Sequence, residues 1–406
     1  MLAMFDRRPH TRIYMDAAAA TPVRPQVQRA MLPYFTEDFG NAGAVHQEGR
    51  TAEAAIDAAR ADIASLLHVR PRGVVFTGSG TESNNIALIG TIEKRRENGT
   101  PYDQLEILTT RIEHPSILSV CDALASKGVR VRYIDVDEMG IVKLSSLEAL
   151  LSDQTAIVAL AYANSEIGVI EPVRKIARVI RAFEKARDTK ILFHVDAAQA
   201  PLWLTCALDS VMADSIALDA GKCGGPKGVG ILAFRHGVSF SPIFFGGGQE
   251  QGIRAGTENT SLIVGAAMAL KIAQEGYEKR AAQVSVLRDT FAEMLLEIDG
   301  AVLNGTLSSR IANNVNISIP GIDSEFAVVT LDREGIACST KSACGGAKGS
   351  GSTVVRVISG DEGRALSSIR FTLHEDITRA DVEKTARILA SHVAKMRSAS
   401  QKLTPQ

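Results

Sequence analysis

The sequence has few cysteines, and their number and spacing exclude two common architectures. Its 406 residues include five cysteines and one tryptophan, and no Cys-x-x-Cys pair occurs. An odd cysteine count in a long chain argues against a disulfide framework, and the missing pair argues against a structural zinc site. We therefore expect no bound metal. We expect Cys121, Cys206 and Cys338 to be buried small hydrophobes.

The sequence also lacks an excess of charge and a long apolar run. Lys and Arg number 45 against 46 Asp and Glu, which gives a net charge of -1. This balance gives no electrostatic reason to expect nucleic acid or an anionic membrane as a direct partner. No apolar run is long enough to cross a bilayer, and the first residues do not resemble a signal peptide. We expect a cytoplasmic protein.

Short apolar runs alternate with amphipathic stretches over the first 250 residues. Strands are predicted at 74–76, 106–109, 129–134, 156–160 and 191–195, and helices at 81–97, 115–127 and 173–186. This alternation predicts an α/β fold with a mostly parallel sheet flanked by helices. Ligands of such sheets bind beyond the carboxyl ends of the strands.

The length predicts two domains, since one compact core rarely holds 406 residues. After residue 256 a long helical stretch leads into a second α+β pattern. We expect a large domain over 16–256 and a smaller C-terminal α+β domain over 257–396. The segment 1–15 is expected to pack with the small domain, and 397–406 to form a frayed tail.

Two neighbouring segments indicate a covalently bound cofactor. Lys222 stands among glycines in Leu218-Asp-Ala-Gly-Lys-Cys-Gly-Gly-Pro-Lys-Gly228, and Asp196 ends the apolar run before Gln199. Pyridoxal phosphate needs a lysine for its aldehyde and a carboxylate for its pyridinium nitrogen. A surface lysine in a glycine turn is the alternative.

Two further segments follow predicted strands. In Thr77-Gly-Ser-Gly-Thr-Glu-Ser-Asn-Asn85 the glycines and a helix start suit a phosphate. The alternative there is an ordinary capped helix. His114 would stack on a cofactor ring or move a proton, or else cap the next helix.

The last candidates lie in the C-terminal part. Cys344 heads the glycine-rich segment 345–352, where a thiol could carry a covalent group to an outside acceptor, and Lys341 would favour its thiolate. A Cys338–Cys344 disulfide is the alternative. Arg370 suits capture of a substrate carboxylate, and the alternative is a surface salt bridge.

Taken together, these segments resemble the cysteine desulfurase family, fold-type-I pyridoxal-phosphate enzymes of aminotransferase class V. The resemblance runs from about residue 13 to 376. It rests on Tyr14-Met-Asp-Ala-Ala-Ala-Ala-Thr-Pro22, residues 41–46, Gly80-Thr-Glu-Ser-Asn-Asn85, Glu113-His114, Glu166-Ile-Gly168, His194-Val-Asp-Ala-Ala-Gln199, Lys222 with Gly225-Pro-Lys-Gly228, Arg254-Ala-Gly-Thr257, Ser342-Ala-Cys344 and Ile369-Arg-Phe371.

The resemblance implies a role for each matched position. Lys222 would bind the cofactor aldehyde and move protons, Asp196 would pair with the pyridinium nitrogen, Gln199 would contact the ring oxygen, and His114 would stack on the ring. Gly80, Thr81, Asp219 and Gly221 would line the phosphate site, which Thr257 reaches from the second subunit of a homodimer. Arg370, with Asn164 and Ser165, would bind L-cysteine. Cys344 would attack the substrate sulfur, leaving alanine and a persulfide for a sulfur acceptor such as an iron–sulfur scaffold protein.

Three segments depart from the family pattern. Asp219, Ala220 and Gly221 stand where the family usually has Ser-Gly-His, and a carboxylate at 219 would repel phosphate if it pointed inward. Ser165 replaces a usual asparagine, and Asn41-Ala-Gly-Ala44 replaces Asn-Pro-Ser-Ser. We expect a divergent but active enzyme. The alternatives are another class V reaction, such as selenocysteine cleavage or transamination, and a catalytically weak sulfur-carrier or scaffold-binding homologue.

Overall fold

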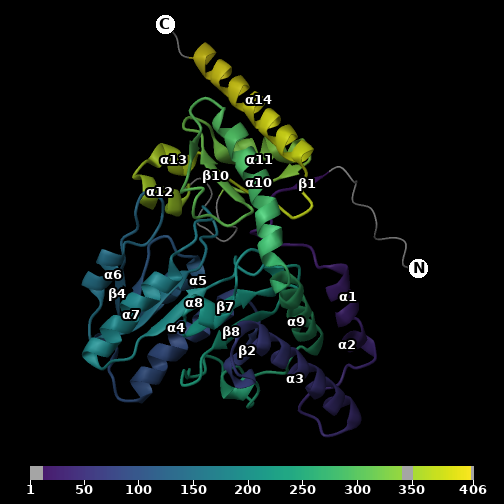
Figure 1. The fold of residues 1–406 in the computed structure, drawn as a ribbon, viewed down its shortest axis with the longest axis vertical. Coiled ribbons are helices and arrows are strands. Elements are labelled where there is room, and N and C mark those ends of the chain that lie inside the picture. Colours follow the sequence, from purple (N-terminus) through teal and green to yellow (C-terminus); the bar gives the residue numbers. More distant parts are fainter. Residues whose placement is uncertain (1–11, 341–350, 404–406) are drawn as a thin grey trace. The chain divides into compact units, whose positions relative to one another are not determined.

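The computed structural model describes residues 12–340 and 351–403 (Figure 1). These residues form two compact units. The larger contains residues 20–164 and 170–279, and the smaller contains 12–19, 165–169 and the described residues from 280 onward. Helix α9 (Thr260–Gln274) belongs to the larger unit, where it packs on α1 (Pro25–Met31) and α3 (Gln47–Leu67). The domain limits at 256 and 257 stay a prediction.

A seven-stranded sheet forms the centre of the larger unit, in the order β2-β8-β7-β6-β5-β3-β4. Its strands are β2 (Val74–Thr77), β3 (Glu106–Thr109), β4 (Arg130–Tyr133), β5 (Thr155–Ala161), β6 (Leu192–Asp196), β7 (Ser215–Asp219) and β8 (Gly230–Phe234). In this sheet only β8 runs against the others, pairing antiparallel with both β2 and β7. The mostly parallel α/β sheet expected from the sequence is confirmed, as are the five predicted strands.

Helices cover both faces of this sheet, because adjacent strand residues point to opposite sides. Leu108 lies in the core that includes residues of α3, α9 and α7 (Val173–Arg187). Its neighbour Ile107 lies in the core that includes residues of α4 (Gly80–Glu97) and α5 (Pro115–Ala125). Both residues are fully buried, which explains the near-continuous apolar runs of the strands. Besides α1, α3 and α9, the helices are α2 (Pro33–Thr36), α4 (Gly80–Glu97), α5 (Pro115–Ala125), α6 (Leu144–Leu150), α7 (Val173–Arg187) and α8 (Leu208–Val211).

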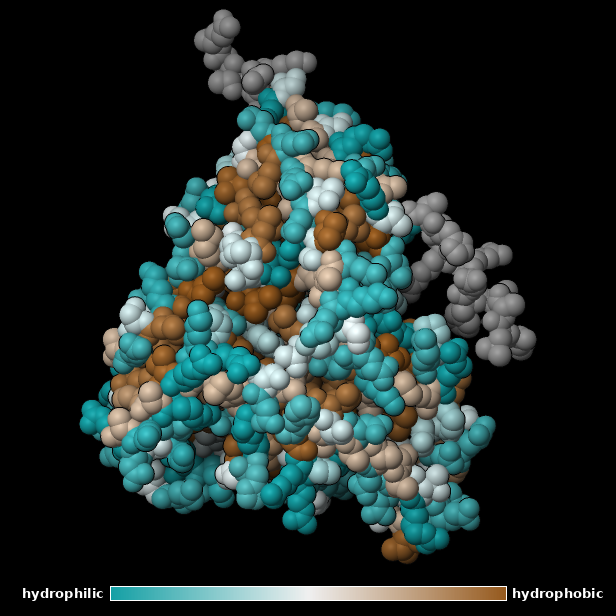
Figure 2. All heavy atoms as spheres, viewed as in Figure 1, coloured by the Kyte–Doolittle hydropathy of each residue, from teal (hydrophilic) through white to brown (hydrophobic). Residues whose placement is uncertain are grey.

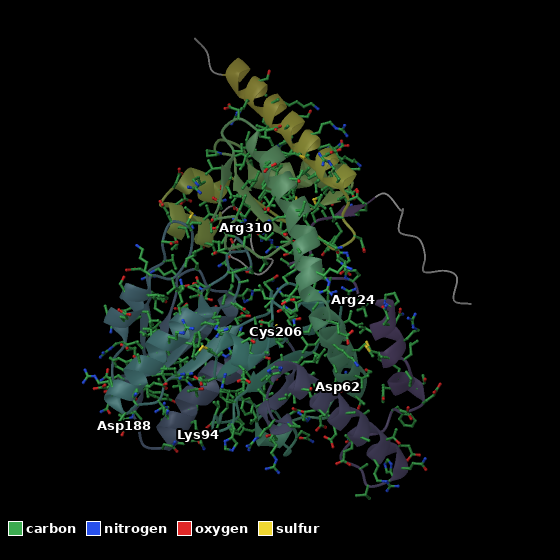
Figure 3. All side chains as sticks on the ribbon, viewed as in Figure 1. Arg24, Asp62, Lys94, Asp188, Cys206 and Arg310 are labelled. Atoms are coloured by element: carbon green, nitrogen blue, oxygen red, sulfur yellow. The ribbon has the colours of Figure 1, made fainter. Side chains whose placement is uncertain are left out.

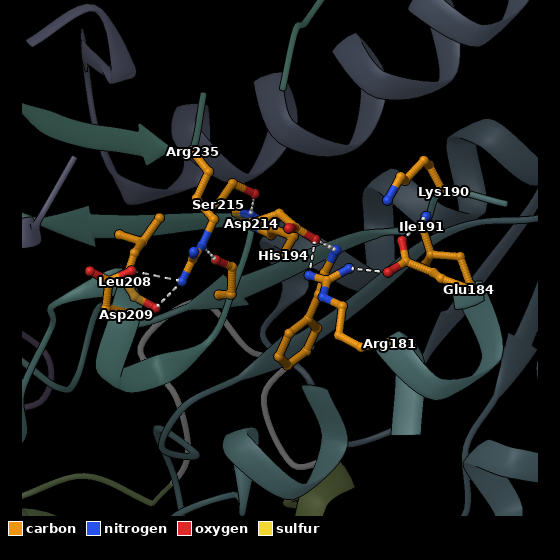
Figure 4. A network of polar contacts seen from close by, with 12 residues as sticks. Arg181, Glu184, Lys190, Ile191, His194, Leu208, Asp209, Asp214, Ser215 and Arg235 are labelled. Carbon is orange, nitrogen blue, oxygen red and sulfur yellow. Dashed lines mark hydrogen bonds and ion pairs between the residues drawn. The ribbon is translucent and has the colours of Figure 1, made fainter. Parts of the chain in front are cut away.

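An ion-pair cluster fixes the amino end of β6, the strand that carries Asp196 (Figure 4). Arg181 of α7 donates to Glu184 Oε2 (2.7 Å) and to Asp214 Oδ2 (2.6 Å). The two carboxylates in turn accept the backbone amides of Ile191 and Phe193, each at 2.8 Å. The start of β6 is thus held in register by side chains, which positions its other end for the chemistry described below.

The smaller unit joins the start of the chain to its C-terminal part. Strand β1 (Ile13–Tyr14) pairs parallel with β11 (Ile336–Ala337). A second sheet has the antiparallel order β12-β10-β9. Its strands are β9 (Val302–Leu303), β10 (Asn314–Ser318) and β12 (Ser368–Thr372), and the helices of this part are α10 (Tyr277–Leu296), α11 (Ser324–Arg333), α12 (Thr353–Ser359), α13 (Glu362–Leu366) and α14 (Arg379–Leu403). In the described part of the chain, no helix is both long and apolar enough to cross a membrane.

Candidate active site

Lys222 lies in a short turn directly after β7. The 3-10 helix η3 (Ala220–Lys222) follows Asp219, the last residue of that strand. Thr21 holds the turn: its amide and its hydroxyl both donate to Gly221 O (2.9 and 3.0 Å), and its hydroxyl accepts from Gly224 N (2.8 Å). Thr21 is buried, so these hydrogen bonds are shielded from water and fix the backbone around Lys222.

Asp196 lies at the end of β6, next to β7 in the sheet. Its Oδ2 accepts from Asn84 Nδ2 (2.8 Å), and its Oδ1 accepts from Ala198 N (3.0 Å). The carboxylate is buried and receives donors on both oxygens. The carboxyl ends of two adjacent parallel strands thus carry the acid and the lysine that the sequence singled out.

His194 lies two residues before Asp196 and points to the same side of the strand. Its Nε2 lies 2.9 Å from Asn84 Oδ1, and its Nδ1 lies 2.8 Å from Ser215 Oγ. Because Asn84 Oδ1 can only accept, Nε2 carries the hydrogen and Nδ1 accepts from the serine. Complete burial lowers the pKa of His194 to about 4, so the ring is neutral near pH 7.

His114 caps helix α5, as the alternative interpretation predicted. Its Nδ1 accepts from the Ser116 amide (3.1 Å) and lies 2.8 Å from Ser116 Oγ. Asn84 Nδ2 also donates to that hydroxyl (2.8 Å). A continuous chain of hydrogen bonds therefore links His114 to Asp196 through Ser116 and Asn84.

The proposed phosphate residues lie at the start of α4. Ser79 caps the helix by accepting from Glu82 N (3.2 Å), and Gly80 and Thr81 are its first two residues. The capped helix given above as the alternative is thus present. Asp219 turns its carboxylate toward the same helix end, where Oδ2 accepts from Gly80 N (3.2 Å). The side chain at 219 therefore does point to the amide expected to bind phosphate.

Comparison with known proteins assigns the family. The model described as Aminotransferase class-V matches residues 13–385. A cysteine desulfurase IscS of Dictyoglomus turgidum is 35% identical, over 96% of each chain. The chain belongs to the cysteine desulfurase family. A cysteine desulfurase IscS of Methanosarcina thermophila is 36% identical, over 97% of this chain and 95% of that protein.

Solved structures of this family have the same fold. A NifS-like protein superposes with a TM-score of 0.86 at 32% identity, covering 94% of this chain and 99% of that one. The structure described as SspA in complex with cysteine gives a TM-score of 0.76 at 31% identity, over 89% and 98%. These matches confirm the fold-type-I architecture expected from the sequence.

Pyridoxal phosphate is the cofactor of this family, and the residues present fit its ring end. Asp196 offers a buried carboxylate whose two hydrogen bonds leave lone pairs for a protonated ring nitrogen. The neutral His194 adds no competing positive charge. The phosphate end fits less well, because Asp219 already binds one amide there.

Arg370, in the smaller unit, forms a buried ion pair. It is 1% exposed, its Nη2 donates to Asp16 Oδ1 (2.8 Å), and its Nη1 donates to Ser165 O (2.9 Å). The alternative interpretation as a surface salt bridge is wrong, since Arg370 lies on the central part of β12 and is covered. Its Nε is buried and has no hydrogen-bond acceptor among the described residues.

The remaining substrate and cofactor candidates occupy varied positions. Asn164 is buried and donates to Ile112 O (2.8 Å), so its amide is already engaged. Ser165 contributes its carbonyl to Arg370. Gln199 lies in the turn after β6, and Thr257 is exposed. Their contacts with cofactor, substrate or a second subunit stay predictions.

The cysteines divide as the sequence suggested, as far as the structure describes them. Cys121, Cys206 (labelled in Figure 3) and Cys338 are buried. Burial raises the pKa of Cys121 and of Cys338 to about 12, so both are unreactive thiols near pH 7. Cys344 and Lys341 lie outside the described residues, as does any Cys338–Cys344 pairing.

Sequence reasoning assigned no role to Asn84, Ser116, His194 and Thr21. Thr21, Asn84 and His194 occur in motifs given above, and Ser116 lies in the predicted helix at 115–127. Their partners lie far away in sequence: Asn84 and Asp196 are 112 residues apart, and Thr21 and Gly221 are 200 apart. The signal was thus a polar residue in a short motif, and only the fold reveals its partner.

Proposed function

We propose that the chain is a pyridoxal-phosphate-dependent cysteine desulfurase, which converts L-cysteine to L-alanine and transfers the sulfur to Cys344. The observation that carries the proposal is the pair formed by the Lys222 turn and the Asp196 carboxylate at the ends of adjacent strands. The cysteine desulfurases to which the chain is similar support the choice of substrate.

When bound, the cofactor supplies an electron sink for the substrate's Cα. Lys222 would hold the cofactor aldehyde and afterwards move the proton at Cα. Asp196 would hold the proton of the ring nitrogen, with Asn84 and the Ala198 amide fixing its carboxylate. His114, oriented by its bond to the Ser116 amide, would stack on the ring.

Two residues of the C-terminal part of the chain would bind the substrate and accept its sulfur. Arg370 would bind the carboxylate of L-cysteine through its guanidinium group. The Cys344 thiolate would attack the substrate sulfur. The bond from Cβ to sulfur breaks, the carbon takes a proton and becomes alanine, and a persulfide remains on Cys344. An acceptor thiol would then remove the outer sulfur.

The proposal includes a homodimer and a cytoplasmic sulfur acceptor, such as an iron–sulfur scaffold protein. Large hydrophobic side chains are exposed around the connection from α1 to α3, at Leu32, Phe35, Phe39 and Val45. Phe245, exposed by 88%, adds another on the segment that leads to Thr257. Figure 2 shows hydrophobic groups among hydrophilic ones on the face in view. Exposed apolar groups of this size favour a protein interface.

The first test is sulfide release from L-cysteine by the purified protein supplied with pyridoxal phosphate and a reductant. The Cys344→Ser variant should no longer release sulfide, because no thiol is left at position 344 to attack the substrate sulfur. A Cys338→Ser variant is the matched control and should retain release, because that thiol is buried and protonated. Release that survives Cys344→Ser would contradict the persulfide assignment.

The position of Asp219 favours one second candidate, a sulfur-carrier homologue with weak catalysis. Its carboxylate binds the Gly80 amide, so cofactor loading would be poor. No sulfide release from the wild type at millimolar pyridoxal phosphate would make this second function the better one.

A further inference from the structure

Asp219 bridges the end of β7 and the start of α4. Its Oδ2 accepts from Gly80 N (3.2 Å), and its Oδ1 accepts from Gly221 N (3.0 Å). Gly80 is the first residue of an 18-residue helix. Amides in the first turn of a helix have no acceptor within it and attract anions. Asp219 therefore occupies the anion-binding end of α4.

The approach of the carboxylate to the helix is close. A Cβ added to Gly80 would lie 3.2 Å from Asp219 Cβ and 3.5 Å from its Oδ2. The side chain thus lies directly over Gly80. An incoming anion that used the Gly80 amide would have to share it with Asp219 or displace it.

Glu82, the other acidic residue near this helix end, differs from Asp219 because it is paired with an arginine. Glu82 accepts from Gly78 N (2.6 Å), and Arg254 pairs with its other oxygen (2.9 Å). Within the described part of the chain, no salt bridge joins Asp219 to a lysine or an arginine. The nearby Lys227 packs its Cγ 3.3 Å from a Cβ position on Gly221 but is exposed. Asp219 is thus the uncompensated anion at this helix end.

We propose that Asp219 competes with the cofactor's phosphate for the Gly80 amide, so that this chain discriminates little between pyridoxal phosphate and unphosphorylated pyridoxal. The proposal rests on the proposed function. A phosphate monoester carries nearly two negative charges near pH 7, and a like charge within a few ångström opposes its binding. Pyridoxal lacks the phosphate group, so the negative charge of Asp219 would not oppose its binding.

The test is a titration of the cofactor-free protein, with visible absorbance of the bound cofactor as readout. Wild type and Asp219→Asn are each titrated with pyridoxal phosphate and with pyridoxal. The asparagine keeps the shape and one acceptor oxygen but removes the charge. We expect Asp219→Asn to bind pyridoxal phosphate about tenfold more tightly or better, and pyridoxal within about twofold of wild type.

Two further variants keep the result interpretable. Asp219→Ser should give the same gain for pyridoxal phosphate, and it replaces Asp219→Asn if that variant is unstable in a thermal melt. Asp62→Asn removes one charge from an exposed position on α3 (labelled in Figure 3) and should change neither affinity. A gain with Asp62→Asn as well would mean that net charge alone is responsible, and would overturn the proposal.

The remaining outcomes separate this inference from the function on which it rests. Equal affinity of wild type and Asp219→Asn for pyridoxal phosphate overturns the role of Asp219 but leaves the desulfurase intact. An equal gain for both ligands also overturns it, since the effect would then not act on the phosphate. Binding of neither ligand by any of these proteins would refute both proposals.

Discussion

Two aspartates end adjacent strands of the same sheet, Asp196 on β6 and Asp219 on β7. Both accept hydrogen bonds on both oxygens, and both lie where ligands of such sheets bind. Asp196 takes one bond from the Asn84 side chain, whereas Asp219 takes both from backbone amides. They differ most in the part of the cofactor that each would face.

A carboxylate with hydrogen bonds on both oxygens favours or opposes a ligand according to the charge of the ligand group beside it. Beside a protonated ring nitrogen, the charge of Asp196 stabilises the bound ligand. Beside a phosphate, the charge of Asp219 opposes it. Hydrogen-bond geometry alone would not distinguish the two residues, because each has its donors in place.

The largest expected effect tests whether both aspartates belong to a cofactor site. Lys222→Ala should abolish the visible absorbance of bound pyridoxal phosphate, because the proposed covalent bond to the aldehyde uses the Lys222 amine. Lys227→Ala, five residues away and exposed, is the matched control and should keep it. If Lys222→Ala still bound the cofactor covalently, the roles of both aspartates would need reassignment.

Removing each negative charge in turn sharpens the comparison. Asp196→Asn should lower kcat for sulfide release by about 1,000-fold, because the ring nitrogen loses the acceptor that keeps it protonated. Asp219→Asn should leave kcat at saturating cofactor nearly unchanged. Steady-state measurement of kcat for sulfide release in both variants is the test. A similar loss of kcat in the two variants would mean that Asp196 and Asp219 do not differ in their roles.

The surroundings of Asp196 should give a characteristic pH dependence of folding. Burial lowers the pKa of His194 to about 4 and raises that of Glu113 to about 7, from 6.5 and 4.5. Neutral His194 contributes stability that is present above pH 6.5 and lost toward pH 4, since the unfolded chain binds the proton first. Protonated Glu113 acts oppositely: its stabilisation is present below pH 4.5 and lost as the pH rises through 7.

Single variants should uncover these opposing contributions. As the pH falls from 6.5 to 4.5, the unfolding free energy of His194→Gln should rise relative to that of wild type by about 1.4 kcal/mol for each pH unit. Glu113→Gln should lose a similar amount over the same range. Denaturant unfolding of the cofactor-free proteins measures both, and parallel curves for all three would show that neither pKa is shifted.

The smallest effect concerns the residue that holds Asp196. Asn84→Ala should weaken cofactor binding by about tenfold, because Asp196 and His194 each lose a buried partner. Asn85→Ala is the control, since the Asn85 side chain donates to Thr81 O of its own helix. Equal affinities in the two variants would mean that Asn84 does not position Asp196.

The sequence predicted local features better than distant partners. The strands and the ends of α4 and α5 followed from apolar runs, glycines and capping residues, which act within a few positions. The direction of Asp219 and the burial of Arg370 depend on segments that approach only in the folded chain. Asp16, the partner of Arg370, is 354 residues away, and no periodicity connects the two.

The pairing of β1 with β11 has a consequence for the newly made chain. Residue 13 finds its strand partner only at residue 336. At the usual speed of translation, of about 5–20 residues per second, the first strand waits roughly 15–65 s for the second. During that interval the backbone groups of β1 have no strand partner. A chaperone or an N-terminal fusion partner would therefore act on this segment chiefly before synthesis ends.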